Sequence, residues 1–286
     1  MVEAAGSPAA VAAAEPFFGF SGHRLALPNG DSVLVTAYGA QAVSWQAAGR
    51  ERLFASARIS PQPWPIRAGV PLCWPQFNRR GTLPKHGFVR NLHWQLSHAA
   101  SEPQSASLRF TLESNPDTLA LWPQAFHLAQ TITLRPGQLH IKLEVTNPGA
   151  TPLAFTGAQH TYLAVDDIDQ ASLLGLQGAP EWDATHDRHQ TAGLPEPLGQ
   201  GFDRVYAWGT APLVLADGAH RLQIEKSASW PEVVVWNPGP ALCAQLPDMA
   251  SDDHRRMLCV EAAQLGSAIV VPPGAHWSGW QTLTVL

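Results

Sequence analysis

The feature that most constrains the fold of this chain is a set of short runs in which apolar and polar residues alternate. Residues 107–113 and 139–145 alternate in this way, which is typical of a β-strand with one buried face. Asn29-Gly30 and Asp217-Gly218 each lie between two extended segments, as in a β-hairpin. The pattern therefore predicts many antiparallel strands joined by tight turns.

Helices contribute little to this pattern. The one helical candidate is a short segment at residues 248–256, and residues 258–260 and 268–271 are expected to be separate short strands. An α/β fold would need long amphipathic helices between the strands, and the sequence shows none. Many short strands with frequent turns are typical of stacked antiparallel sheets, so we predict an all-β fold.

The length and composition of the chain are compatible with one large domain. Of its 286 residues, 45% are hydrophobic and 14% are charged, so a sizeable apolar core can form. Residues 1–17 are rich in alanine and lack the basic start and unbroken apolar run of a signal peptide. We expect residues 1–17 to be a disordered or loosely docked tail and residues 18–286 to form a single sandwich domain.

Charge and cysteine usage exclude several classes of protein. A net charge of -5 argues against a nucleic-acid partner, which would need a basic face. No apolar run approaches the roughly 20 residues that span a bilayer. Cys73, Cys243 and Cys259 are too widely spaced for a zinc knuckle or a disulfide framework. We expect a cytoplasmic monomer that binds neither nucleic acid nor membrane.

Residues 67–90 hold the densest group of potential ligand-binding side chains. Recurring prolines and glycines predict an ordered loop with two short extended pieces. Arginine and lysine pair with phosphates and carboxylates, so the loop indicates a site for an anionic, hydroxyl-rich ligand. A basic surface loop with a hydrophobic anchor explains the same residues about as well. The side chains in question are Arg67, Trp74, Phe77, Arg79, Arg80, Lys85, His86 and Arg90.

Two further positions carry groups that can transfer protons. His160 lies in an extended, mostly apolar segment, and Glu261 ends a strand that is apolar before it. Taken singly, a satisfied core histidine and a surface carboxylate explain them better, because an unpaired buried charge is costly. Taken together, a histidine and a glutamate form a natural acid and base pair near neutral pH.

Several blocks, in their order along the chain, resemble one family. The blocks are Arg67-Ala-Gly-Val-Pro71 with Cys73-Trp-Pro75, Pro84-Lys-His-Gly-Phe-Val-Arg90, His160-Thr-Tyr162, Phe202-Asp-Arg-Val-Tyr206, Val235-Trp-Asn-Pro238 and Met257-Leu-Cys-Val-Glu261. Together they resemble the glucose-6-phosphate 1-epimerases, the hexose-6-phosphate mutarotase branch of the aldose 1-epimerase superfamily. The resemblance implies a galactose-mutarotase-like supersandwich of stacked antiparallel sheets, in agreement with the strand pattern.

The resemblance also implies a chemistry and its residues. Such enzymes interconvert the α and β anomers of a hexose 6-phosphate, without a metal or other cofactor, by opening and reclosing the sugar ring. His160 matches the acid that protonates the ring oxygen, and Glu261 matches the base that takes the proton from the C1 hydroxyl. We expect the two to face each other across a cleft on one sheet. The predicted substrate-binding residues are Arg67, Lys85, His86, Arg90 and Asp203.

The sequence departs from the family pattern at three places. Lys85 stands where glutamine is usual, and Ala68 replaces the first glycine of a Gly-Gly pair. Residues 239–243 lack a tryptophan and a lysine that usually follow the Trp-Asn-Pro block. These changes leave open an epimerase that acts on an unphosphorylated aldose or on a different sugar phosphate.

Three other interpretations compete with this one. In a non-catalytic carbohydrate-binding sandwich, Arg67, Arg90 and Asp203 would hold a sugar. His160 and Glu261 would then have only a structural role. A metal-dependent hydrolase or isomerase would draw on His186 and His189, although their polar surroundings favour a solvated loop. Cys259 as a nucleophile is disfavoured because it lies in mid-strand among apolar residues, where a thiol is inert.

Overall fold

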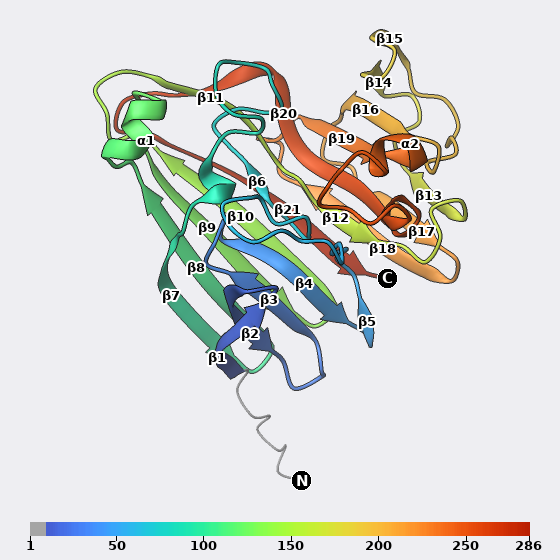
Figure 1. Ribbon diagram of the computed structural model, residues 1–286, viewed down its shortest axis with the longest axis horizontal. Helices are drawn as coiled ribbons and strands as arrows, with labels where there is room; N and C mark the ends of the chain where they lie inside the picture. Colours follow the sequence, from blue (N-terminus) through green and yellow to red (C-terminus); the bar gives the residue numbers. More distant parts are fainter. Residues whose placement is uncertain (1–9) are drawn as a thin grey trace.

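Three antiparallel sheets make up the described part of the chain, residues 10–286 of the computed structural model (Figure 1). The N-terminal sheet has five strands in the order in which they occur along the chain. Its hairpin between β2 and β3 turns at Asn29-Gly30, as predicted. The strands are β1 (Ala10–Phe17), β2 (Phe20–Ala26), β3 (Ser32–Thr36), β4 (Gln41–Ala47) and β5 (Arg50–Glu51).

The second sheet has eight strands in the order β13-β17-β18-β21-β10-β9-β8-β7. Its strands β8 and β10 include the two alternating runs on which the fold prediction rests, and β17 and β18 form the predicted Asp-Gly hairpin. The strands are β7 (Gln95–Glu102), β8 (Ser105–Glu113), β9 (His127–Arg135), β10 (Gln138–Thr146), β13 (Ala171–Leu174), β17 (Leu213–Asp217), β18 (His220–Lys226) and β21 (His276–Val285).

The third sheet also has eight strands, in the order β15-β14-β16-β19-β20-β11-β6, with β12 pairing to β20. Its strand β20 lies between β19 and β11 and runs through the middle of the molecule in Figure 1. The strands are β6 (Leu72–Cys73), β11 (Leu153–Gln159), β12 (Tyr162–Ala164), β14 (Pro180–Asp183), β15 (Arg188–Thr191), β16 (Phe202–Ala207), β19 (Glu232–Asn237) and β20 (Met257–Val271).

One apolar cluster joins the three sheets. Val33 from the N-terminal sheet, Leu108 from the second and Val260 from the third belong to the same cluster and are fully buried. Side chains of a strand alternate between its two faces, and in β8 and β10 every second residue points into this core. We interpret the chain from residue 18 onward as a single domain because its main core is shared in this way.

The helical prediction is largely wrong. Two short α-helices, α1 (Pro116–Leu121) and α2 (Gly239–Cys243), were not expected from the sequence. The 3₁₀ turn η1 (Val89–Asn91) lies at the end of the loop of residues 67–90. Of residues 248–256, only Asp253–Arg256 are helical, as the 3₁₀ turn η2. Helices this short do not display the 3.6-residue period by which a helix is recognised.

The expected tail and two expected strands also need correction. Residues 10–17 of the expected tail form β1, which pairs with β2, and Glu15 accepts a hydrogen bond of 2.6 Å from Arg24 Nε. The alanine-rich sequence of this strand lacks the alternation that would have marked it. Residues 1–9 of the expected tail lie outside the described residues. Residues 258–260 and 268–271 are not separate strands, because β20 is continuous over 15 residues.

Residues 67–90 form a loop, as predicted, which holds one short strand, β6, where two extended pieces were expected, and the start of η1. Its aromatic residues Trp74 and Phe77 are buried. Gly69 and Gly87 have positive φ angles of 51° and 71°. A Cβ atom would clash with the carbonyl oxygen of Ala42 at the first position and of Trp74 at the second. Glycine therefore lets this loop lie directly against neighbouring backbone.

A substitution tests how strongly this close approach matters. We expect Gly87→Ala to lower the free energy of unfolding by about 3 kcal/mol or more, because strain and a backbone clash add together. Gly178→Ala is the matched control: Gly178 also has a positive φ, of 83°, but no atom lies within 4 Å of a Cβ there. That variant should lose only about 1–2 kcal/mol. Equal losses in chemical denaturation would contradict the tight packing of the loop.

Candidate active site

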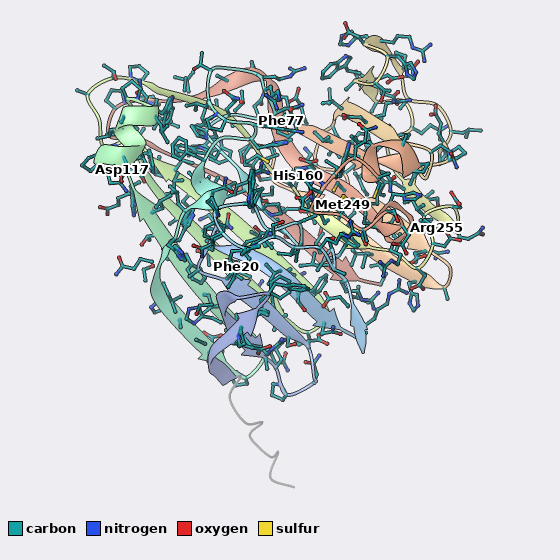
Figure 2. All side chains as sticks on the ribbon, in the orientation of Figure 1. Phe20, Phe77, Asp117, His160, Met249 and Arg255 are labelled. Carbon is teal, nitrogen blue, oxygen red and sulfur yellow. The ribbon has the colours of Figure 1, made fainter. Side chains whose placement is uncertain are left out.

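The register of the third sheet brings His160 and Glu261 together. Gln159 at the end of β11 pairs with Ala262 of β20, so the next residue, His160, lies opposite Glu261. His160 Nε2 is 3.4 Å from Glu261 Oε1. The two side chains are thus in contact, where we predicted that a cleft would separate them. Figure 2 shows His160 near the middle of the molecule.

Asp203 lies on the same face of this sheet. It pairs with Trp236 of β19, which pairs with Cys259 of β20. Cys259 and Glu261 are two residues apart on one strand, so their side chains share a face. Asp203 is close enough to Glu261 to influence its ionisation, as described below.

A small pocket of about 70 Å³ opens beside His160. Its lining includes four of the five predicted substrate-binding residues, namely Arg67, Lys85, His86 and Arg90. Small-molecule sites are usually about 300–1,000 Å³. A sugar phosphate therefore fits only if side chains at the mouth move, and Lys85 is exposed and long enough to do so.

Burial controls the ionisation of the central pair. Burial raises the pKa of Glu261 well above its usual value, and the negative charge of Asp203 raises it further. Burial also lowers the pKa of His160 well below its usual value, with Arg90 and Arg67 adding to the effect. Both shifts favour the uncharged forms, a protonated carboxyl and a neutral imidazole. Burial raises the pKa of Asp203 to about 6.

Three cations converge on the pocket. Arg67 forms an ion pair with Asp248, at 2.9 Å, whereas no carboxylate in the described part of the chain lies within ion-pair distance of Lys85 or Arg90. Partial burial lowers the pKa of Lys85, and the positive charges of Arg67 and Arg90 lower it further. The pocket therefore has an excess of positive charge that suits an anion.

His86 is held as a neutral hydrogen-bond donor. Its Nδ1 accepts a hydrogen bond of 3.3 Å from the backbone N–H of Asn78, so the ring proton lies on Nε2. Burial lowers the pKa of His86 strongly, and the charge of Arg90 lowers it further. Its ring centroid is 5.5 Å from that of His160, so the two imidazole rings lie close together.

Several buried polar atoms at the site lack a partner among the described residues. They include His160 Nδ1, Glu261 Oε2 and Arg90 Nε. Buried polar groups are normally hydrogen-bonded, so atoms of this kind mark positions where water or ligand hydroxyls can bind.

Sequence reasoning missed two residues of the pocket, Asp248 and Tyr162, whose side chains both contact Arg67. Asp248 is separated from Arg67 by 181 positions, and no spacing rule links such distant residues. Tyr162 stands within one of the family blocks, two residues after His160 on an extended segment. The expected alternation of side chains could have placed it on the same face as His160.

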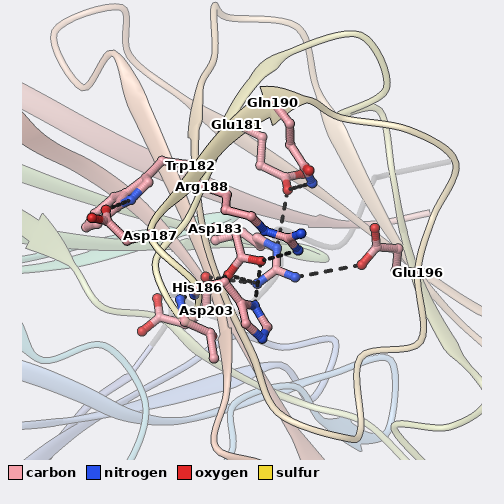
Figure 3. Close-up of polar contacts among 11 residues, drawn as sticks. Glu181, Trp182, Asp183, His186, Asp187, Arg188, Gln190, Glu196 and Asp203 are labelled. Atoms are coloured by element: carbon pink, nitrogen blue, oxygen red, sulfur yellow. Dashed lines mark hydrogen bonds and ion pairs between the residues drawn. The ribbon is translucent and has the colours of Figure 1, made fainter.

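The structure does not support the two competing sites, a nucleophilic Cys259 and a metal site at His186 and His189. Burial raises the pKa of Cys259 well above its usual value, which leaves the thiol unreactive. His186 Nδ1 lies 2.8 Å from Asp183 Oδ2, and Arg188 contacts the same carboxylate (Figure 3). His189 stacks on the ring of Trp182. Within residues 10–286, no three His, Cys, Asp or Glu side chains are placed to hold a metal ion.

Solved structures define the class of protein. A candidate mutarotase from Salmonella typhimurium superimposes with a TM-score of 0.88 at 27% identity, over 96% of this chain and 93% of its own. A galactose mutarotase-like protein from Clostridium acetobutylicum superimposes with a TM-score of 0.77 at 13% identity, over 96% and 98% of the two chains, which shows the fold alone. The chain has the galactose-mutarotase-like fold, as predicted.

Sequence comparison defines the family. The profile of the aldose 1-epimerases matches residues 23–284. A curated relative from Cenchrus ciliaris is 30% identical over 85% of this chain and 78% of its own length, and one from Escherichia coli K12 is 35% identical over 79% and 77%. Both are named as candidate glucose-6-phosphate 1-epimerases. The chain belongs to the aldose 1-epimerase family, whose members are isomerases.

The electrostatic description of His160 can be tested by titration. Arg90→Gln removes a cation that lowers the pKa of His160, so the pKa should rise in this variant. NMR chemical shifts of the imidazole ring, followed against pH, measure the change. Arg135→Gln is the control, because Arg135 lowers the pKa of His140 instead and should leave His160 unaffected. An unchanged or lower pKa for His160 in Arg90→Gln would refute the description.

Proposed function

We propose that this protein interconverts the α and β anomers of a hexose 6-phosphate, with glucose 6-phosphate as the reference substrate. The observation that carries the proposal is the contact between His160 and Glu261 beside a pocket with three cations. The names of the two curated relatives support the same assignment.

The cations account for recognition of the phosphate. A phosphate dianion favours several charge-assisted donors, and Arg67, Lys85 and Arg90 supply them from one loop. The Nε2–H of His86 and the carboxylate of Asp203 are suited to sugar hydroxyls, one as a donor and the other as an acceptor.

The central pair accounts for ring opening. Glu261 removes the proton from the C1 hydroxyl while His160 gives a proton to the ring oxygen. The ring opens to the aldehyde, C1 rotates about the C1–C2 bond, and the ring closes with the roles of the two groups reversed. Each positioned proton transfer of this kind contributes about 100-fold to 10,000-fold to the rate.

The phosphate also helps to set the protonation state for this reaction. The charges of Arg90 and Arg67 both lower the pKa of His160. A phosphate dianion bound beside them offsets these charges and raises the pKa of His160, which favours the protonated imidazole that ring opening needs as its acid. A sugar without a phosphate lacks this effect, so the arrangement favours a phosphorylated substrate.

We further propose that the protein acts as a monomer in the cytoplasm. Cys73, Cys243 and Cys259 are all buried and unpaired, as is usual in a reducing compartment. Within residues 10–286, the helices are all too short or too polar to cross a membrane.

Rates of anomer exchange test the proposal. We expect His160→Asn and Glu261→Gln each to lower the rate of α-to-β exchange of glucose 6-phosphate by about 100-fold to 10,000-fold. Saturation-transfer NMR measures this rate. Glu144→Gln is the control, since Glu144 pairs with Arg109 on the second sheet, and it should retain full activity.

Free glucose, measured in parallel, separates the alternatives. If the wild-type protein accelerates exchange of neither sugar, the proposed function fails and the carbohydrate-binding interpretation is favoured. If it accelerates only free glucose, the substrate is an unphosphorylated aldose.

A further inference from the structure

Arg67 is held on two sides before any ligand binds. Its Nε and Nη2 each donate a hydrogen bond of 3.0 Å to the Asp248 carboxylate, and its Nη1 donates one of 2.8 Å to the Tyr162 hydroxyl. A guanidinium has five N–H groups, and these contacts use three of them. One N–H remains on each of the two Nη atoms, a spacing that suits two oxygens of one phosphate.

Tyr162 connects this arginine to the proposed acid. The Tyr162 ring stacks on the His160 ring with a centroid distance of 4.8 Å and an interplanar angle of 7°. Tyr162 is buried and belongs to β12, which pairs with β20. Asp248, Arg67, Tyr162 and His160 therefore form a continuous set of contacts from the pocket to the central pair.

Asp248 comes from a segment that is fixed independently. It follows α2, whose residues 239–243 depart from the family pattern, and it precedes η2. Asp253 anchors the segment, because its carboxylate accepts hydrogen bonds from Ser56 Oγ, at 2.6 Å, and from the backbone N–H of Ala250, at 2.8 Å. Asp253 contacts neither Arg67 nor the pocket.

We propose that Asp248 and Tyr162 are positioning residues that fix Arg67 for the substrate's phosphate and so set the preference for a phosphorylated over a free sugar. The inference rests on the proposed function. A free arginine loses side-chain entropy when it binds a ligand, whereas an arginine that is already held loses less. Because Asp248 offsets the charge of Arg67, this arginine mainly orients the bound phosphate. The uncompensated positive charge that attracts the phosphate comes from Lys85 and Arg90.

Two conservative variants test this proposal. Asp248→Asn removes the charge and one acceptor, and Tyr162→Phe removes only the hydroxyl. We expect Asp248→Asn to raise KM for glucose 6-phosphate by about 10-fold with kcat changed less than about 3-fold, and Tyr162→Phe to show a smaller rise. Binding of inorganic phosphate, measured by calorimetry, should weaken by similar factors.

Asp253→Asn is the matched control. It loosens the same segment but keeps both contacts that hold Arg67, so it should lower the melting temperature and change KM and phosphate affinity much less than Asp248→Asn does. The proposal is overturned if Asp248→Asn weakens phosphate binding no more than Asp253→Asn does, or if it lowers kcat while KM stays the same.

The phosphate titration separates this inference from the proposed function. If the wild-type protein does not catalyse anomer exchange, the proposed function fails, while the comparison of phosphate affinities still decides the role of Asp248. If the wild-type protein does not bind inorganic phosphate at all, the positioning role is refuted whatever the activity.

Discussion

The buried carboxyl group of Glu261 is the constraint around which the site is organised. A carboxylate in the interior of a sheet is costly unless nearby groups compensate for it. Here burial and the charge of Asp203 favour the protonated carboxyl, and the charges of Arg90 and Lys85 act against them. His160 is in contact with this group. The long strand β20 fixes Glu261 between β19 and β11, so the strand register decides which side chains can reach it.

The loop of residues 67–90 supplies the opposite charge. Gly69 lets the loop approach the backbone of Ala42 in β4, and Gly87 lets it fold back against Trp74. Trp74 and Phe77 anchor it in the apolar interior. The cations then lie beside the acid and base pair without being part of it. This separation lets one group of residues bind an anion while another transfers protons.

Most of the fold, but only part of the active site, could be predicted from the sequence. Alternating runs such as that of β10 and the Asn-Gly and Asp-Gly turns predicted antiparallel sheets directly. The short helix α1 and the alanine-rich strand β1 escaped notice because neither shows a period. Family blocks led to His160 and Glu261, whereas Asp248 depends on a contact between distant segments that no local pattern reveals.

A crystal structure of the Glu261→Gln variant with bound glucose 6-phosphate would test the central claim most directly. The account predicts that phosphate oxygens lie about 2.7–2.9 Å from side-chain nitrogens of Arg67 and Arg90. It also predicts that the C1 hydroxyl lies beside residue 261 and the ring oxygen beside His160. A phosphate bound elsewhere, or a sugar whose C1 points away from both side chains, would contradict it.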